Sequence, residues 1–423
     1  MCTEYCISLK VSILKCRHGG DGVRKQLMFR FYGLVVVLYL SDMVLFLSNL
    51  WNVYRITSSS VFLGVSMALG TLTPYFLKKS GLIRIKSSLR LVDLYKRRII
   101  IYSLLILIAL FHYADSPFGF IAVSISIGYL SLITLSTLET YNTKLALKGY
   151  ISAQKASRIM QTVVQIGAFL GAALSGYLLE ATSLRGVAAG VGYNGLIAAL
   201  CVFDIIVSLV AGYVIFHDEY SATGVVPSAT EKKLTPMPQA DRLSLELKLL
   251  CVCIGLIGFH ICAYNTLATI LFQSVKNFSS EYYGLCSAVA GVGAFLAAFI
   301  KIPRFEFILP ALMLGMADLI FSTTQSPYLA VVFCFFIGFS MNTMRINARK
   351  HMIEATQTET QAELVGSYSG MLYTISQSAG YVILGLLTSP ALMGPQAAIY
   401  LLPLIGLIIF IYVLFLLARR AKV

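Results

Sequence analysis

Twelve apolar stretches, each about as long as a bilayer is thick, constrain the fold of this chain more than any other feature. A helix needs about 20 mostly apolar residues to cross a bilayer. Of the 423 residues, 58% are hydrophobic and only 12% are charged, which is more apolar surface than a soluble domain could bury. The sequence therefore predicts an all-α polytopic membrane protein. The predicted spans are 28–50, 56–77, 99–114, 117–138, 159–180, 195–216, 248–273, 281–301, 305–323, 327–345, 364–388 and 396–418.

The basic residues predict the direction in which these spans run. If every stretch crosses the membrane, all of the 33 Lys and Arg residues except Arg55, Arg185 and Lys276 lie on one side. Because basic loops remain in the cytoplasm, we expect a multi-pass protein of the plasma (inner) membrane with both termini cytoplasmic. The net charge of +14 is then explained by orientation and by anionic lipid headgroups. No basic helix or finger spacing indicates nucleic acid binding.

A polar segment at 217–247 divides the twelve spans into two sets of six. It is rich in charged residues and proline, as expected of a linker. We therefore expect a cytoplasmic tail (1–27), an N-terminal six-helix bundle (28–216), a cytoplasmic linker (217–247), a C-terminal six-helix bundle (248–418) and a cytoplasmic C-terminus (419–423). Pseudosymmetric halves of this kind enclose a central site in secondary transporters, which open it alternately to each side.

Signatures of catalysis and of bound cofactors are missing from the sequence. There is no phosphate-cradling glycine loop, metalloprotease helix or serine nucleophile elbow. The nine cysteines are scattered, and the pair Cys251 and Cys253 has no second pair or histidine cluster beside it. We expect no enzyme activity, no cofactor and no metal, so an ion gradient must supply the energy for any transport.

The loop between the second and third spans contains Asp93, Arg97 and Arg98. This cluster resembles the signature of the major facilitator superfamily, in which an Asp followed by arginines opens the third span. The resemblance implies twelve helices in two bundles, with the cluster acting as a gating latch between them. A plain topogenic cluster is the alternative interpretation.

Small residues in the fifth span resemble the antiporter motif of the same superfamily. Gly167, Gly171 and Gly176 match its spaced glycines, whereas Ala172 stands where the motif has proline. The resemblance implies a conformational role and favours export in exchange for protons. Generic packing of small residues between helices is the alternative.

The first two spans are similar to the branch of this superfamily that includes the enterobactin exporter. The matching residues are Leu40-Ser41-Asp42-Met43 and the segment 53–64, with an Asp in span one and a Thr-x-Ser turn before span two. The resemblance implies efflux of a siderophore or drug.

Two titratable residues inside the spans are candidates for proton coupling. An ionised Asp42 near the middle of span one would cost roughly 3 kcal/mol on insertion scales, so it should face a wet cavity or be protonated. His260 occupies a related place in span seven, and histidine titrates near physiological pH. For both, a structural hydrogen bond to a neighbouring helix is the alternative. The same alternative is preferred for Asp204 and Asp318.

Uncharged polar residues in the spans are candidates for cargo binding, because side-chain amides and phenols can pair with a polar ligand. Hydrogen bonding between helices is their alternative role. The candidates are Asn49, Gln161, Gln165, Tyr264, Asn265, Tyr373 and Gln377. Glu139 and Arg345, at the ends of spans four and ten, are assigned instead to loop charge networks.

These features together predict a proton-coupled secondary transporter that exports a small amphipathic or chelating molecule by alternating access. Import of a small nutrient or iron chelate is the first alternative. A lipid-moving protein or a membrane-embedded enzyme is the second. The expected partners are a small-molecule substrate, protons and membrane lipids, and we expect a monomer.

Overall fold

The described residues form twelve α-helices, as the sequence predicts. The computed structural model describes residues 2–80, 91–147, 153–189, 192–222, 243–300, 306–356 and 359–420, and within these ranges it describes most side chains from residue 28 onward. The helices are α1 (Cys2–Thr57), α2 (Ser60–Lys79), α3 (Leu91–Leu110), α4 (Pro117–Leu147), α5 (Ala153–Ala189), α6 (Tyr193–Ala222), α7 (Leu245–Ile270), α8 (Ser280–Leu296), α9 (Ile308–Thr323), α10 (Pro327–Ala355), α11 (Glu359–Leu387) and α12 (Ala398–Arg420). A π-helical turn, η2 (Leu271–Val275), extends α7, and a 3₁₀ turn, η3 (Pro395–Ala397), precedes α12.

Each predicted span overlaps one helix, in the same order. Within the described residues, nine helical segments are long and apolar enough to cross a membrane. α9 is a shorter apolar helix, α8 has 17 residues, and α3 begins with a charged turn. Several helices continue beyond the apolar stretch that predicted them. α10, for instance, runs ten residues past the predicted end of its span at 345.

The turn between α1 and α2 shows how the sequence sets a helix boundary. Ser58 adopts a positive φ of 48°, which ends α1, and the Ser59 side chain accepts a hydrogen bond from the backbone N–H of Phe62. This cap satisfies one of the free N–H groups at the start of a helix. α2 therefore begins at Ser60, four residues later than the predicted start of span two.

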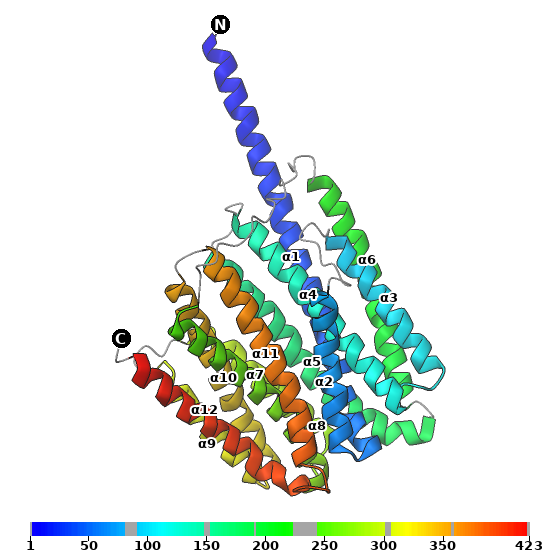
Figure 1. The fold of residues 1–423 in the computed structure, drawn as a ribbon. Helices are drawn as coiled ribbons and strands as arrows, with labels where there is room; N and C mark the ends of the chain where they lie inside the picture. The colour runs from blue at the N-terminus through cyan, green and yellow to red at the C-terminus, as the bar shows by residue number, and fades with distance from the viewer. Residues whose placement is uncertain are drawn as a thin grey trace.

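The helices pack as two halves, α1–α6 and α7–α12, with both chain termini at the same end of the molecule (Figure 1). In the first half α1 packs on α5 and α6, α3 on α6, and α2 on α4. In the second half α7 packs on α11 and α12, and α9 on α10 and α12. The main contacts between halves join α5 to α8 and α2 to α11. This two-half arrangement is the fold that the sequence predicts.

Candidate functional site

A cavity of about 190 Å³ lies between the two halves. Helices α1 and α5 of the first half supply part of its wall, and α7, α8 and α10 of the second half supply the rest. Its polar lining consists of Gln165, His260, Tyr264, Asn265, Ser287, Asn342 and Arg345. Its apolar lining includes Met43, Ala168, Ile257, Ile261, Ile337 and Met341. Four of the residues that the sequence marks as site candidates, Gln165, His260, Tyr264 and Asn265, are thus brought together here.

Arg345 supplies a fixed positive charge to the cavity. The guanidinium carbon lies 5.4 Å from the centre of the Tyr373 ring, and the Nε atom is buried without a hydrogen-bond partner. Within the described residues, no carboxylate forms an ion pair with Arg345. The sequence predicts that Arg345 belongs to a network of charged residues in the loop, because the predicted span ends at this residue. α10 continues to Ala355, so the arginine lies well inside the helix and faces the cavity.

His260 borders the cavity and is held from behind by Asp318. The Nε2 atom of His260 lies 2.8 Å from Oδ2 of Asp318, and both side chains are buried. The second carboxylate oxygen, Oδ1 of Asp318, is buried without a hydrogen-bond partner. The pair joins α7 to α9, which agrees with the expected hydrogen bond from Asp318 to an adjacent helix.

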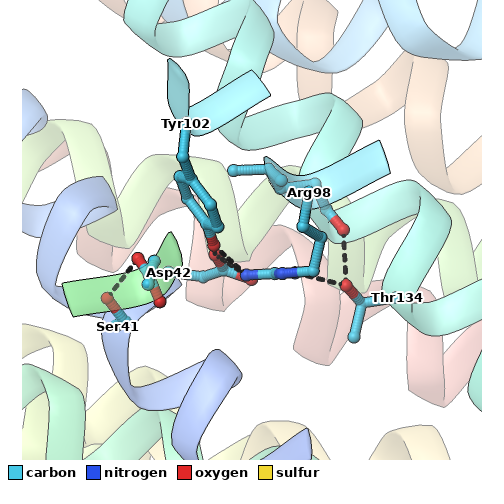
Figure 2. Close-up of polar contacts among 7 residues, drawn as sticks. Ser41, Asp42, Arg98, Tyr102 and Thr134 are labelled. Atoms are coloured by element: carbon cyan, nitrogen blue, oxygen red, sulfur yellow. Dashed lines mark hydrogen bonds and ion pairs between the residues drawn. The ribbon is translucent and has the colours of Figure 1, made fainter. Parts of the chain in front are cut away.

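Asp42 does not face this cavity but forms an ion pair inside the first half (Figure 2). The Nη2 atom of Arg98 donates to Oδ1 of Asp42 at 2.5 Å, and the same nitrogen contacts the Tyr102 hydroxyl. Tyr102 donates to Asp42 at 3.0 Å, and Nη1 of Arg98 donates to Thr134 at 2.6 Å. Arg98 is fully buried and Asp42 is 6% exposed. From the sequence we expect Asp42 to face a wet cavity or to be protonated. The structure instead pairs it with the charge of Arg98.

A second carboxylate, that of Asp204 on α6, lies close to this ion pair. Its Oδ2 accepts a hydrogen bond of 2.6 Å from Ser41, the neighbour of Asp42 on α1. Asp204 is fully buried, and one oxygen of each carboxylate, Oδ2 of Asp42 and Oδ1 of Asp204, has no hydrogen-bond partner. Arg98 therefore forms an ion pair with Asp42, whereas Asp204 is held by Ser41. The expected bond from Asp204 to an adjacent helix is present.

Three further candidates for cargo binding lie away from the cavity lining. Asn49 is fully buried. It donates a hydrogen bond to Ser124 and accepts one from Tyr193, each 2.8 Å long, so it connects helices of the first half. The Tyr373 ring lies next to the Arg345 guanidinium and to Gly258, and Gln377 lies four residues further along α11. The side chain of Gln161 lies outside the described residues.

The gating candidates occupy two different places. Asp93 is half-buried in the first turn of α3. Arg97 takes part in a polar or electrostatic contact, whereas Arg98 points into the interior and pairs with Asp42. Gly167 and Gly171 let α5 lie directly on α1, where an added Cβ would come within 2.5 Å of Tyr39 and 2.2 Å of the Leu40 carbonyl.

Gly176, by contrast, joins the two halves. A Cβ on Gly176 would lie 2.8 Å from the Cα of Gly284 on α8, and a Cβ on Gly284 would lie 2.5 Å from the Cα of Gly176. Two backbones therefore touch at this crossing, which only glycine permits.

Polar contacts join the halves from the middle of α2 and α11 to the end of the molecule away from the chain termini. They are the bonds of Tyr54 to Ser274 (2.7 Å), Gln273 to the Trp51 carbonyl (3.0 Å), Ser60 to the Gly385 carbonyl (2.8 Å), Thr71 to Ser378 (2.6 Å) and Ser280 to Glu180 (2.8 Å). Trp51 also packs on Tyr283, with ring centres 5.2 Å apart. We call this set of contacts the far-side seal. Sequence reasoning missed it, because single Ser, Thr and Tyr residues in apolar spans give no distinctive pattern.

Known proteins share this fold. The family model described as Major Facilitator Superfamily matches residues 88–381. No curated protein sequence matches the chain. One similar solved structure is a bacterial homologue of the iron transporter ferroportin in an inward-facing state, with 11% identity, coverage of 92% of this chain and 98% of that one, and a TM-score of 0.69. Another is a bacterial homologue of the human lysosomal transporter Spinster, inward-facing and unoccupied, with 14% identity, coverage of 94% and 96% of the two chains, and a TM-score of 0.63. A third is the nucleoside transporter NupG, with 13% identity, coverage of 92% and 99%, and a TM-score of 0.59.

Proposed function

Since this chain belongs to the major facilitator superfamily and is a multi-pass secondary transporter, we propose that it exports a small amphipathic or chelating molecule in exchange for protons. The observation that supports this most strongly is the cavity between the halves, which has walls from both. A site shared by two bodies that close at one end is what alternating access requires. Cargo held there would be released when the far-side seal opens.

The orientation in the membrane follows from the charge pattern. We place both termini in the cytoplasm, because all but three of the 33 Lys and Arg residues then lie on that side. The far-side seal then lies at the outer face, and this conformation is the inward-facing one. The solved homologues of ferroportin and Spinster are described as inward-facing as well.

His260 is our proposed coupling residue. It borders the cavity, so a change in its protonation would alter the charge next to bound cargo, and its Nε2 atom lies 2.8 Å from Oδ2 of Asp318. Asp42 is less suited to direct coupling, because Arg98 already neutralises it away from the cavity. A proton at His260 can therefore bias the two conformations through their different affinities for it.

The cargo that we propose is an organic molecule or a chelate rather than a free metal ion. Two similar structures are described as an iron transporter homologue and a bacterial metal transporter. Within the described part of this chain, however, no three His, Cys, Asp or Glu residues are grouped so that they could hold a metal ion. A chelate needs no such ligands, because its metal is already coordinated.

The proposal is tested by counterflow in proteoliposomes that contain the purified protein. Vesicles are loaded with one unlabelled siderophore or amphipathic drug at a time, and entry of the labelled compound is followed with and without an imposed pH gradient. We expect at least one compound to exchange without a gradient and to move against its own gradient when the pH gradient is imposed. Exchange that ignores the pH gradient would contradict proton coupling. Movement in the same direction as protons would indicate an importer instead.

A further inference from the structure

Among the described residues that line the cavity, one carries a permanent charge, and that charge is positive. The lining residues of α1, α5 and α8 carry no charged side chain, α7 contributes His260, and α10 contributes Arg345. Two acids on helices that line or flank the cavity are already paired, Asp42 with Arg98 and Asp318 with His260. The guanidinium of Arg345 therefore has no compensating carboxylate within the described residues.

The guanidinium also lies over an aromatic ring. The centre of the Tyr373 ring on α11 is 5.4 Å from the guanidinium carbon, an arrangement in which the ring face attracts the cation. The Nε donor is buried without a partner. Leaving a buried donor of a charged group without an acceptor is costly. An arginine fork that has no carboxylate partner within the described residues suits an oxyanion, which can accept two hydrogen bonds from it.

The rest of the wall suits an apolar body. Met43 comes from α1, Ile257 and Ile261 come from α7, and Ile337 and Met341 come from α10. Methionine side chains adapt to ligands of irregular shape. The uncharged groups of Gln165 and Asn265 can bond to polar substituents without adding charge.

We infer that the cavity selects amphipathic organic anions, whose carboxylate, sulfonate or phosphate group binds Arg345 while the apolar part lies against the methionine and isoleucine side chains. This inference rests on the proposed function, since it names the class of cargo for the same cavity. The inference predicts that the cavity binds anionic amphiphiles more tightly than neutral or cationic amphiphiles of the same size.

The test uses two fluorescent probes that share one aromatic body, 1-anilinonaphthalene-8-sulfonate, which is an anion, and N-phenyl-1-naphthylamine, which is neutral. Binding is titrated in nanodiscs of zwitterionic lipid, with empty nanodiscs as background. We expect Arg345→Gln to weaken sulfonate binding by at least about tenfold and to leave binding of the neutral probe unchanged. Arg345→Lys should give an intermediate loss, because it keeps the charge but not the fork.

The matched control is Arg419→Gln. Arg419 is exposed on α12 and also lies over an aromatic ring, that of Phe415 at 5.5 Å, so this variant removes the same charge away from the cavity. It should bind both probes as the unaltered protein does. Equal sulfonate affinity in Arg345→Gln and Arg419→Gln would overturn the inference. Tighter binding of the neutral probe than of the sulfonate to the unaltered protein would also overturn it, yet would leave proton-coupled export of another cargo intact.

Discussion

His260 on α7 and Asp318 on α9 form a buried pair, 2.8 Å apart, that reverses the charges of Asp42 on α1 and Arg98 on α3. Counted from the start of each half, α7 and α9 correspond to α1 and α3. Each half thus ties its first helix to its third by a buried acid–base pair, with the acid on opposite helices. Only the second pair borders the cavity, through His260. This asymmetry suggests a structural role for the first pair and a coupling role for the second.

Replacing His260 with glutamine should separate transport from the proton gradient. Glutamine can still donate a hydrogen bond to Asp318 but cannot gain a proton. We expect exchange without a gradient to continue, while accumulation driven by a pH gradient is lost. Flux in proteoliposomes measures both. The control is His351→Gln, at the end of α10, where the imidazole lies 2.9 Å from Glu306 outside the cavity lining. Gradient-driven accumulation that survives in His260→Gln would assign coupling to another group.

Removing the carboxylate of Asp42 should destabilise the protein more than removing that of Asp204. Asp42→Asn leaves the fully buried Arg98 without its ion-pair partner, and breaking a buried pair in this way costs about 3–5 kcal/mol. Asp204→Asn keeps that pair and can still accept the hydrogen bond from Ser41. Thermal unfolding in detergent, followed by circular dichroism, measures the difference. Equal melting temperatures for the two variants would show that Asp42 does not compensate Arg98.

Adding a methyl group at Gly176 should weaken the closed state of the far-side seal. The new Cβ would lie 2.8 Å from the Cα of Gly284, so α5 and α8 could not approach as closely. We expect Gly176→Ala to populate conformations with the far side open. The control is Gly366→Ala on α11, where a Cβ meets no atom within 4 Å. Access of a water-soluble maleimide to a cysteine placed at Trp51 reports opening, and equal labelling rates in both variants would count against a role for this crossing.

Deleting one hydroxyl should loosen the same seal by a smaller amount. Tyr54→Phe removes the 2.7 Å bond to Ser274 between the halves, which is worth about 0.5–1.5 kcal/mol. Trp51, the single tryptophan of the chain, lies beside this bond and packs on Tyr283. Its fluorescence should become more accessible to iodide in Tyr54→Phe but not in Tyr400→Phe, an exposed position on α12. Unchanged quenching in both would show that the bond does not hold the seal.

The helix count and the division into halves could be predicted from the sequence, because spans of bilayer length and a one-sided distribution of basic residues are strong signals. The positions of Arg98 and Arg345 could not be predicted, and the reason is the same for both. An apolar stretch ends at its last apolar residue, whereas the helix continues. α3 begins eight residues before its predicted span, and α10 ends ten residues after its own. Two arginines expected in loops therefore lie inside helices.

The hydrogen-bond and ion-pair partners of buried polar residues could not be predicted from the sequence either. Asp42 was recognised as costly in an apolar span, but Arg98 and Tyr102 that neutralise it come from another helix. Their spacing of four residues places them on one face of α3, and this is the signal that could have suggested an ion pair. His260 and Asp318 are 58 residues apart, and nothing in either local sequence indicates the other.

Two distances between spin labels, measured by pulsed electron resonance in nanodiscs, test alternating access about this cavity most directly. One pair, at Ile56 and Leu392, spans the halves on the far side, and the other, at Lys96 and Ile353, spans them on the terminus side; all four side chains are exposed. Lowering the pH through the titration range of histidine should lengthen the first distance and shorten the second. In His260→Gln neither should change with pH. Distances in the unaltered protein that stay constant, or that lengthen and shorten together, would contradict the account.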